Sequence, residues 1–159
     1  MNYAQIRRYD AANGNGIGCT LFVSGCTFHC KNCFNKEYQN FNYGKPFDLD
    51  TKNKFIEMCK NPNVDHVSLL GGEVLHQNLA IIVDLLSRLK EEVKKPIWLW
   101  TGYTYKEMDS FRKLIVEKYV DYLIDGKYIE ELKDLNLLYR GSSNQNVYKK
   151  VNGVFTKIL

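Results

Sequence analysis

The chain reads CTLFVSGCTFHCKNCFN over residues 19–35. Its first part, residues 19–24, is a short and mostly apolar run that ends at Gly25, which is typical of a strand buried on both faces. The segment that follows carries Cys26, Cys30 and Cys33 in the spacing Cys-x3-Cys-x2-Cys. We therefore expect a buried strand whose carboxyl end leads into a loop that carries the three cysteines.

Three more runs of the same kind predict three more buried strands, at residues 64–70, 97–101 and 120–125. All four runs are followed at once by glycine, namely Gly25, Gly71–Gly72, Gly102 and Gly126. Turns between strands and helices often contain glycine, but glycine also lets the backbone approach a ligand closely. In the third run, Trp98 and Trp100 alternate and so share one face of the sheet. We expect a helix to pack on them, with contact to a partner as the alternative.

Segments between these runs show helical spacing of apolar residues. They lie at residues 50–60, with Asp50 or Thr51 as the cap, at 75–89, and at 105–118. Strands that alternate with helices imply an α/β fold with a mainly parallel sheet. Right-handed crossovers then place all four glycine turns on the edge where active sites of such folds lie.

The end of the chain predicts a different element, a hairpin that turns at Asn152–Gly153 between residues 147–151 and 154–158. No linker or internal repeat interrupts the pattern. We therefore predict a single domain that comprises residues 1–159.

The three clustered cysteines predict a metal centre. A [4Fe–4S] cube held by three thiolates keeps one iron open for chemistry, whereas electron-transfer clusters normally use four cysteines. A structural zinc site is the alternative, with His29, Cys19 or Cys59 as a further ligand. His29 lies between two of the cysteines and would strain one tetrahedral site, while Cys19 and Cys59 suit burial as small apolar side chains. The place of the loop at the mouth of an α/β sheet favours iron–sulfur.

The composition indicates in which part of the cell, and with which partners, this chemistry would take place. The chain has 159 residues, and 45% of them are apolar. Its net charge is +4, and its lysines are spread along the sequence. This distribution of charge does not indicate nucleic-acid binding. The amino-terminal MNYAQIRRYD lacks an apolar core, and no apolar run has the length of a membrane span. We expect a cytoplasmic protein with no membrane partner. Its five cysteines would stay reduced there and serve as ligands rather than disulfides.

Several motifs occur in order along nearly the whole chain. They are MNYAQIRRYD at residues 1–10, the Asn13–Gly14 turn, CTLFVSGC before the cysteine loop, Phe34–Asn35 after it, the turn Gly71-Gly72-Glu73, IWLWTGY at 97–103, LIDGKY at 123–128 and YRGSSNQ at 139–145. Together they resemble the radical S-adenosylmethionine (SAM) superfamily and, within it, the family of anaerobic ribonucleoside-triphosphate reductase-activating proteins. The resemblance implies a β/α barrel. Because 159 residues are few for a closed barrel, we expect a partial, open barrel of the radical SAM type.

The resemblance also implies an activity, that of a radical SAM oxidoreductase which activates a glycyl-radical enzyme. SAM would bind the open iron through its amino and carboxylate groups. One electron, from a donor such as flavodoxin or ferredoxin, would cleave it to a 5′-deoxyadenosyl radical. That radical would take a hydrogen atom from a glycine of the anaerobic ribonucleoside-triphosphate reductase.

Site residues follow from the same resemblance. Cys26, Cys30 and Cys33 match the ligands of the cluster, and no catalytic side chain is expected beyond the cluster and SAM. Glu73 would meet the amino group of SAM. The full set of predicted contacts of SAM and the cluster is Asn32, Cys33, Phe34, Gly71, Gly72, Glu73 and Thr101. Two alternatives stay open: an activase of another glycyl-radical enzyme, of the pyruvate formate-lyase type, and a structural zinc-binding module.

Overall fold

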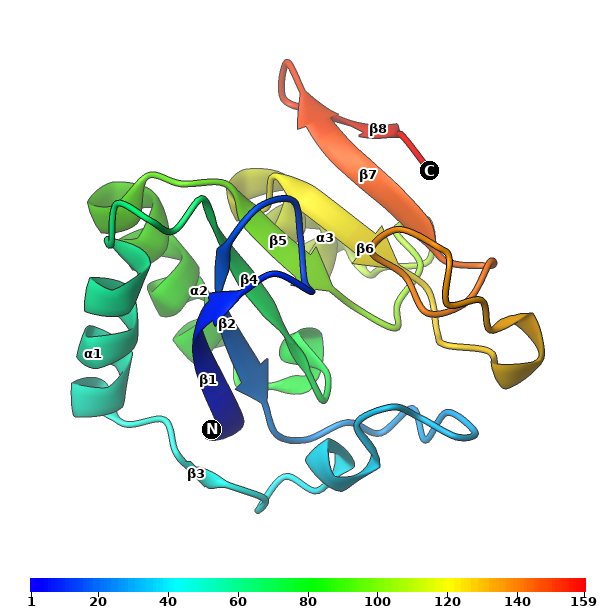
Figure 1. The fold of residues 1–159 in the computed structure, drawn as a ribbon, viewed down its shortest axis with the longest axis horizontal. Coiled ribbons are helices and arrows are strands. Elements are labelled where there is room, and N and C mark those ends of the chain that lie inside the picture. The colour runs from blue at the N-terminus through cyan, green and yellow to red at the C-terminus, as the bar shows by residue number, and fades with distance from the viewer.

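A computed structural model describes residues 1–159 and shows one eight-stranded sheet with the order β3-β1-β2-β4-β5-β6-β7-β8 (Figure 1). The strands are β1 (Asn2–Asp10), β2 (Gly18–Val23), β3 (Lys45–Pro46), β4 (His66–Gly71), β5 (Ile97–Trp100), β6 (Tyr122–Asp125), β7 (Asn146–Val151) and β8 (Val154–Lys157). The helices are α1 (Leu49–Cys59), α2 (Leu79–Arg88) and α3 (Ser110–Tyr119), with short 3-10 turns η1 (Lys36–Gln39), η2 (Val74–His76) and η4 (Glu130–Leu132) and the π-helical turn η3 (Leu89–Val93).

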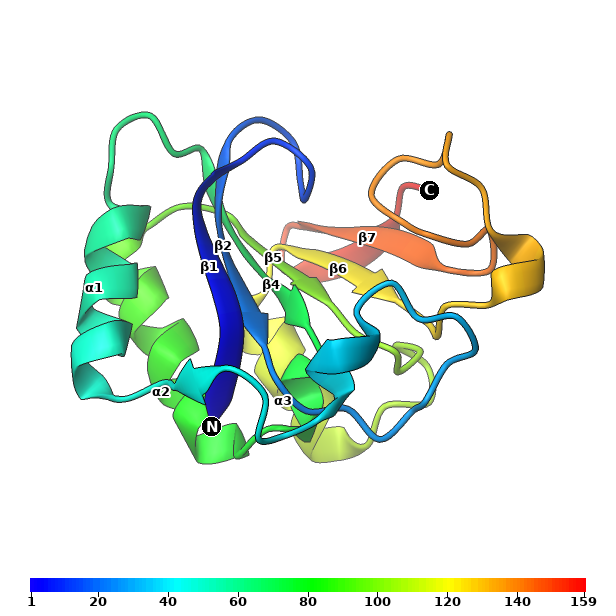
Figure 2. The ribbon, with the colours of Figure 1, turned by 60° about the horizontal axis from the view of Figure 1, so that its bottom comes forward.

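The centre of the sheet is parallel and consists of the four predicted strands. β2, β4, β5 and β6 pair side by side, and one row of their register joins Leu21, Leu69, Leu99 and Leu123. Side chains of this row belong to a core of 24 buried residues that also includes side chains of α1, α2 and α3. The three helices therefore cover one face of the sheet (Figure 2). The carboxyl ends of the four strands meet at one edge.

The prediction of a mainly parallel sheet is wrong, because four of the seven strand pairs are antiparallel. β1 and β3 extend the sheet on one side, and β7 and β8 extend it on the other. Antiparallel neighbours need only short connections, here residues 11–17 and the predicted turn at Asn152–Gly153, whose φ angles are 50° and 78°. The sheet stays open between its edges β3 and β8 and does not close into a barrel.

The second face of the sheet carries no helix, so the expected packing of a helix on Trp98 and Trp100 is wrong. Trp98 stacks on Tyr122 with 4.0 Å between ring centroids and lies edge-on to Tyr139 at 4.9 Å. Trp100 shares this face and donates from its indole nitrogen to Tyr139 O at 2.7 Å. The connection between β1 and β2 and part of the segment between β6 and β7 rise on this side (Figure 2). Loops rather than helices therefore cover the aromatic face.

Helix ends differ from the predicted ones where side-chain caps decide them. α1 is capped by Asp48, whose carboxylate accepts from Thr51 N at 2.8 Å, instead of by Asp50 or Thr51. α3 begins five residues later than predicted, because Asp109 accepts from the first free N–H groups of the helix. None of the helices combines the length and the apolar character that a membrane span requires.

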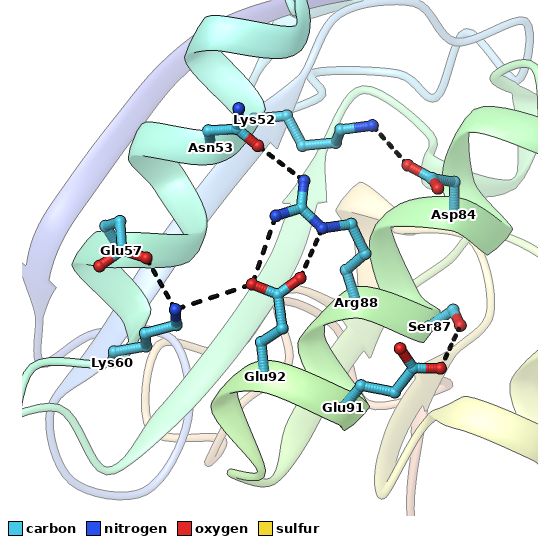
Figure 3. A network of polar contacts seen from close by, with 9 residues as sticks. All are labelled: Lys52, Asn53, Glu57, Lys60, Asp84, Ser87, Arg88, Glu91 and Glu92. Carbon is cyan, nitrogen blue, oxygen red and sulfur yellow. Dashed lines mark hydrogen bonds and ion pairs between the residues drawn. The ribbon is translucent and has the colours of Figure 1, made fainter.

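Ion pairs on the outer surface connect α1 with α2 and η3 (Figure 3). Arg88 is central to them: its Nε donates to Glu92 at 2.7 Å and its NH1 donates to Asn53 of α1 at 2.7 Å. Lys60 pairs with Glu57 at 2.7 Å and approaches Glu92 at 3.7 Å. Exposed pairs of this kind contribute up to about 1 kcal/mol each, so they orient the helices while the core supplies the stability.

Candidate functional site

The cysteine loop leaves the carboxyl end of β2 and is closed by backbone hydrogen bonds to the segment that follows it. Gly25 N donates to Tyr38 O at 2.7 Å, and the next residue, Cys26, donates to Gln39 O at 3.0 Å. Between the cysteines, His29 and Asn32 take left-handed backbone conformations with φ of 51° and 53°. Such conformations are uncommon for residues other than glycine and bend the loop sharply. The loop therefore curls between fixed ends.

All three cysteines of the loop line one cavity of about 600 Å³ at the carboxyl ends of the parallel strands. The glycine turns after β4, β5 and β6 line the same cavity, through Gly71, Gly72, Gly102 and Gly126. Gly72 illustrates why glycine is needed, because a Cβ there would lie 2.6–2.8 Å from backbone atoms of Gly25 and Tyr38. The predicted meeting of the cysteine loop with the glycine turns at one edge is confirmed.

Glu73 links the turn after β4 to the turn after β5. Its side chain is 2% exposed and accepts hydrogen bonds from Leu75 N at 3.0 Å, Thr101 Oγ1 at 2.8 Å and Gly102 N at 2.7 Å. Burial nevertheless raises the pKa of Glu73 to about 7, because desolvation outweighs the three donors. A cation in the cavity would favour the carboxylate form of this side chain.

Two side chains after Glu73, which were not among the predicted site residues, hold the cysteine loop in place. Gln77 is buried and donates from Nε2 to Gly25 O at 3.1 Å. His76 accepts from Thr27 N at Nδ1 over 3.2 Å, and its Nε2 lies 3.1 Å from the Tyr103 hydroxyl. The turn after β4 thus contacts both neighbouring turns. In the sequence, these two polar residues stand three and four positions after Glu73, behind the apolar pair Val74–Leu75.

The donor set of the loop fits an iron–sulfur cluster. The three thiols are free of disulfides and partly exposed to the cavity. Burial is the main cause that raises the pKa of Cys26 to about 11, and nearby charges, among them those of Cys30 and Cys33, add to it. Burial also raises the pKa of Cys30. Bound iron would reverse this shift, because a coordinated thiol loses its proton. No three His, Cys, Asp or Glu side chains converge on a point that could hold one metal ion. The ligands of a cube bind separate irons and need no such point.

The other predicted contacts divide into two groups. Phe34, Gly71, Gly72, Glu73 and Thr101 all line the cavity. Asn32 does not, and its role stays a prediction. Asn35, three residues further on, lines the cavity instead and donates to Gly71 O at 3.4 Å.

Residues from distant segments complete the wall of the cavity. Most of them belong to motifs that carried the resemblance, but none was a predicted contact of SAM or the cluster. Arg7 comes from β1, Ala12 and Asn13 from the connection to β2, and Trp100 from the face of the sheet. The segment between β6 and β7 adds Lys127, Tyr128, Asp134, Leu135, Leu137, Tyr139, Arg140, Gly141 and Gln145. The cavity therefore extends from the cysteines over the helix-free face of the sheet.

Comparison with known proteins agrees with this geometry. Residues 12–148 match the family described as "4Fe-4S single cluster domain", a range that contains the whole cysteine loop. The fold and the site thus define a protein of the single-cluster iron–sulfur class.

Similarity to curated proteins narrows this class. The chain is 41% identical over 155 residues to the anaerobic ribonucleoside-triphosphate reductase-activating protein of Pasteurella multocida (strain Pm70), covering 94% of this chain and 98% of the relative. The protein of the same name from Escherichia coli (strain K12) is 40% identical, and the match covers 93% of this chain and 98% of the relative. That of Enterobacteria phage T4 is 36% identical, and the match covers 98% of both chains. The chain belongs to the family of anaerobic ribonucleoside-triphosphate reductase-activating proteins.

Proposed function

We propose that this chain is an enzyme that activates the anaerobic ribonucleoside-triphosphate reductase by generating a glycyl radical on it, with a [4Fe–4S] cluster and SAM as cofactors. The observation that carries the proposal is the single cavity that collects three free thiols and the glycine turns of three parallel strands. Relatives that match along almost their whole length bear the name of activating proteins of that reductase.

Cys26, Cys30 and Cys33 would hold the cluster and leave one iron open. When bound there, the cluster supplies the electron that splits SAM into methionine and a 5′-deoxyadenosyl radical, which then takes a hydrogen atom from the substrate glycine. The chain itself positions these partners. Gln77, which donates to Gly25 O, and His76, which accepts from Thr27 N, hold the backbone of the cysteine loop, so that the thiols keep their places when the cavity is filled.

The turn at Gly71, Gly72 and Glu73 would receive the amino group of SAM. An ammonium group suits the buried carboxylate of Glu73, which has no ion-pair partner and whose pKa burial raises to about 7. Thr101 would act through Glu73, to which its hydroxyl donates at 2.8 Å. Asn32 and Phe34 would contact the adenine or the cluster from the far side of Cys33.

The finer architecture is part of the same proposal. We propose that the open sheet with parallel strands at its centre is a partial barrel of the radical SAM type and that residues 1–159 form one domain; the parallel strands β2, β4, β5 and β6 at the centre of the sheet support this. Its wide side faces the helix-free part of the cavity, where a segment of a large protein substrate could enter. A flavodoxin or ferredoxin would supply the electron.

One anaerobic experiment tests the function. The chain is reconstituted with iron and sulfide, reduced, and mixed with SAM and the reductase, and the sample is examined by electron paramagnetic resonance and for 5′-deoxyadenosine. We expect about four irons per chain, release of 5′-deoxyadenosine, and a glycyl radical on the reductase. A pyruvate formate-lyase serves as the control substrate and should stay without radical. A colourless protein with one zinc, or SAM cleavage that never yields a radical on the reductase, would refute the proposal.

A further inference from the structure

Five exposed apolar side chains lie on the two segments that border the cavity. They come from the end of the cysteine loop and from the segment between β6 and β7, and we call them the rim patch: Phe34, Ile129, Leu132, Leu135 and Leu138. Leu135 is 83% exposed, Leu138 60% and Phe34 58%. Single exposed apolar residues are common, but a contiguous group of them marks a surface that binds another molecule.

Contacts connect the two segments that carry the patch. The rings of Phe34 and Tyr128 lie 4.9 Å apart, and Lys31 pairs with Glu131 at 3.1 Å. Both ribbon views show the tip of the cysteine loop beside the segment between β6 and β7 (Figures 1 and 2). Phe34 and Leu135 also line the cavity. The rim patch is therefore the outer border of the candidate site.

Backbone hydrogen bonds, and not burial of its leucines, hold the segment between β6 and β7 in shape. Ser143 N donates to Leu132 O at 2.9 Å, and Asp134 N donates to Gly141 O at 3.2 Å. Gln145 accepts from Gly141 N at 2.9 Å with its side-chain oxygen. The leucines of the patch are thus presented on a fixed backbone, which reduces the entropy that a partner must overcome on binding.

Two ammonium groups flank the patch without an ion-pair partner. Lys133 lies 5.2 Å from the ring centre of Phe34, and Lys127 lies 4.8 Å from that of Phe28. Neither takes part in any salt bridge of the chain. Glu130 and Asp134 of the same segment have no ion-pair partner either. The surface complementary to this arrangement has apolar side chains at its centre and charged groups of both signs beside them.

We infer that the rim patch is the docking surface for the protein substrate, the reductase, which meets it with an apolar surface flanked by charged groups. The inference rests on the proposed function, because a substrate glycine has to reach the cavity that the patch borders. A second copy of this chain is the less suitable occupant, since a copy seated on the rim would cap the cavity against that glycine.

The test compares two double variants of the full chain, reconstituted with its cluster. Leu132→Ser with Leu138→Ser alters the patch at two side chains that do not line the cavity. Leu49→Ser with Leu114→Ser is the matched control, at leucines of α1 and α3 that are 65% and 59% exposed. Binding of each to the reductase is measured anaerobically by titration calorimetry, and SAM cleavage is measured without the reductase.

We expect the patch variant to bind the reductase at least about 10-fold more weakly than the control while it cleaves SAM at the wild-type rate. Unchanged affinity of the patch variant would overturn the inference. So would a wild-type dimer that this variant converts to a monomer while its affinity for the reductase stays the same. A wild-type chain that binds the reductase through the patch but cleaves no SAM would refute the proposed function alone.

Discussion

Glu73→Gln isolates the energetic role of one buried carboxylate. Burial raises the pKa of Glu73 from its ordinary 4.5 to about 7, so the folded chain favours the neutral acid. The stability gained from this preference is fully present below about pH 4.5 and is lost as the pH rises through about 7. Each unit of pKa corresponds to about 1.4 kcal/mol, and the loss between pH 5 and pH 8 therefore amounts to about 2.5 kcal/mol. Glutamine has no charge to bury and does not suffer this loss.

The substitution also removes a hydrogen bond, because its amide cannot accept from both Thr101 and Gly102. That term costs about 1–3 kcal/mol and does not depend on pH. Urea unfolding of the cluster-free, reduced chain at pH 5 and pH 8 separates the two terms. We expect the stability of the variant relative to wild type to rise by about 2.5 kcal/mol between these values. Glu91→Gln, at an exposed glutamate of η3, shows what the exchange does outside the site. An equal difference at both pH values would refute the reasoning.

Three further substitutions test the site and the frame that supports it. Gly72→Ala places a Cβ 2.6–2.8 Å from the backbone of the cysteine loop and its closing segment. The amount of iron bound after reconstitution should therefore fall well below that of wild type. Gly153→Ala, in the distant hairpin, is the control and should bind as much iron as wild type. Cys59→Ala, in the core, should lose about 1 kcal/mol in urea unfolding and keep all its iron, and loss of iron would make Cys59 a ligand. Asp48→Ala removes the cap of α1 and should cost about 1 kcal/mol, or about 2–4 °C in Tm, with no change in SAM cleavage; an unchanged Tm would contradict the role of the cap.

The central part of the fold was predictable because its signals are local. The parallel strands are apolar runs that glycine ends, and the hairpin at Asn152–Gly153 requires a left-handed turn that few other residue pairs allow. β1 was missed for the opposite reason. Its residues NYAQIRRYD are mostly half-buried or exposed, so that no apolar run marks the strand. Pairing with β2, which is wholly buried, is what makes it a strand. The sheet therefore gained antiparallel neighbours that the pattern did not indicate.

The candidate site was predictable where one short segment supplies it. The cysteines and the glycine turns follow from motifs, and the topology of parallel strands brings them together. Arg7, Trp100 and Leu135 reach the same cavity from three different parts of the chain, and only the folded backbone decides that they do. Likewise, the hydrogen bond of His76 to the cysteine loop depends on the path of a 3-10 turn that its own sequence does not specify.

The row of leucines across the sheet has a consequence for how substitutions should be tolerated. Leu21, Leu69, Leu99 and Leu123 share one face, and all four have odd numbers, as do their buried neighbours on the same strands that face the helices. Among the even-numbered positions of these strands, Phe22, Leu70 and Trp100 line the cavity, whereas Trp98 and Ile124 belong to a second buried cluster. A survey of every single substitution should therefore separate the residues that line the cavity from those that are packed. Substitutions at the odd positions, and at Trp98 and Ile124, would change how much protein accumulates in the cell, and substitutions at Phe22, Leu70 and Trp100 would change what each molecule does.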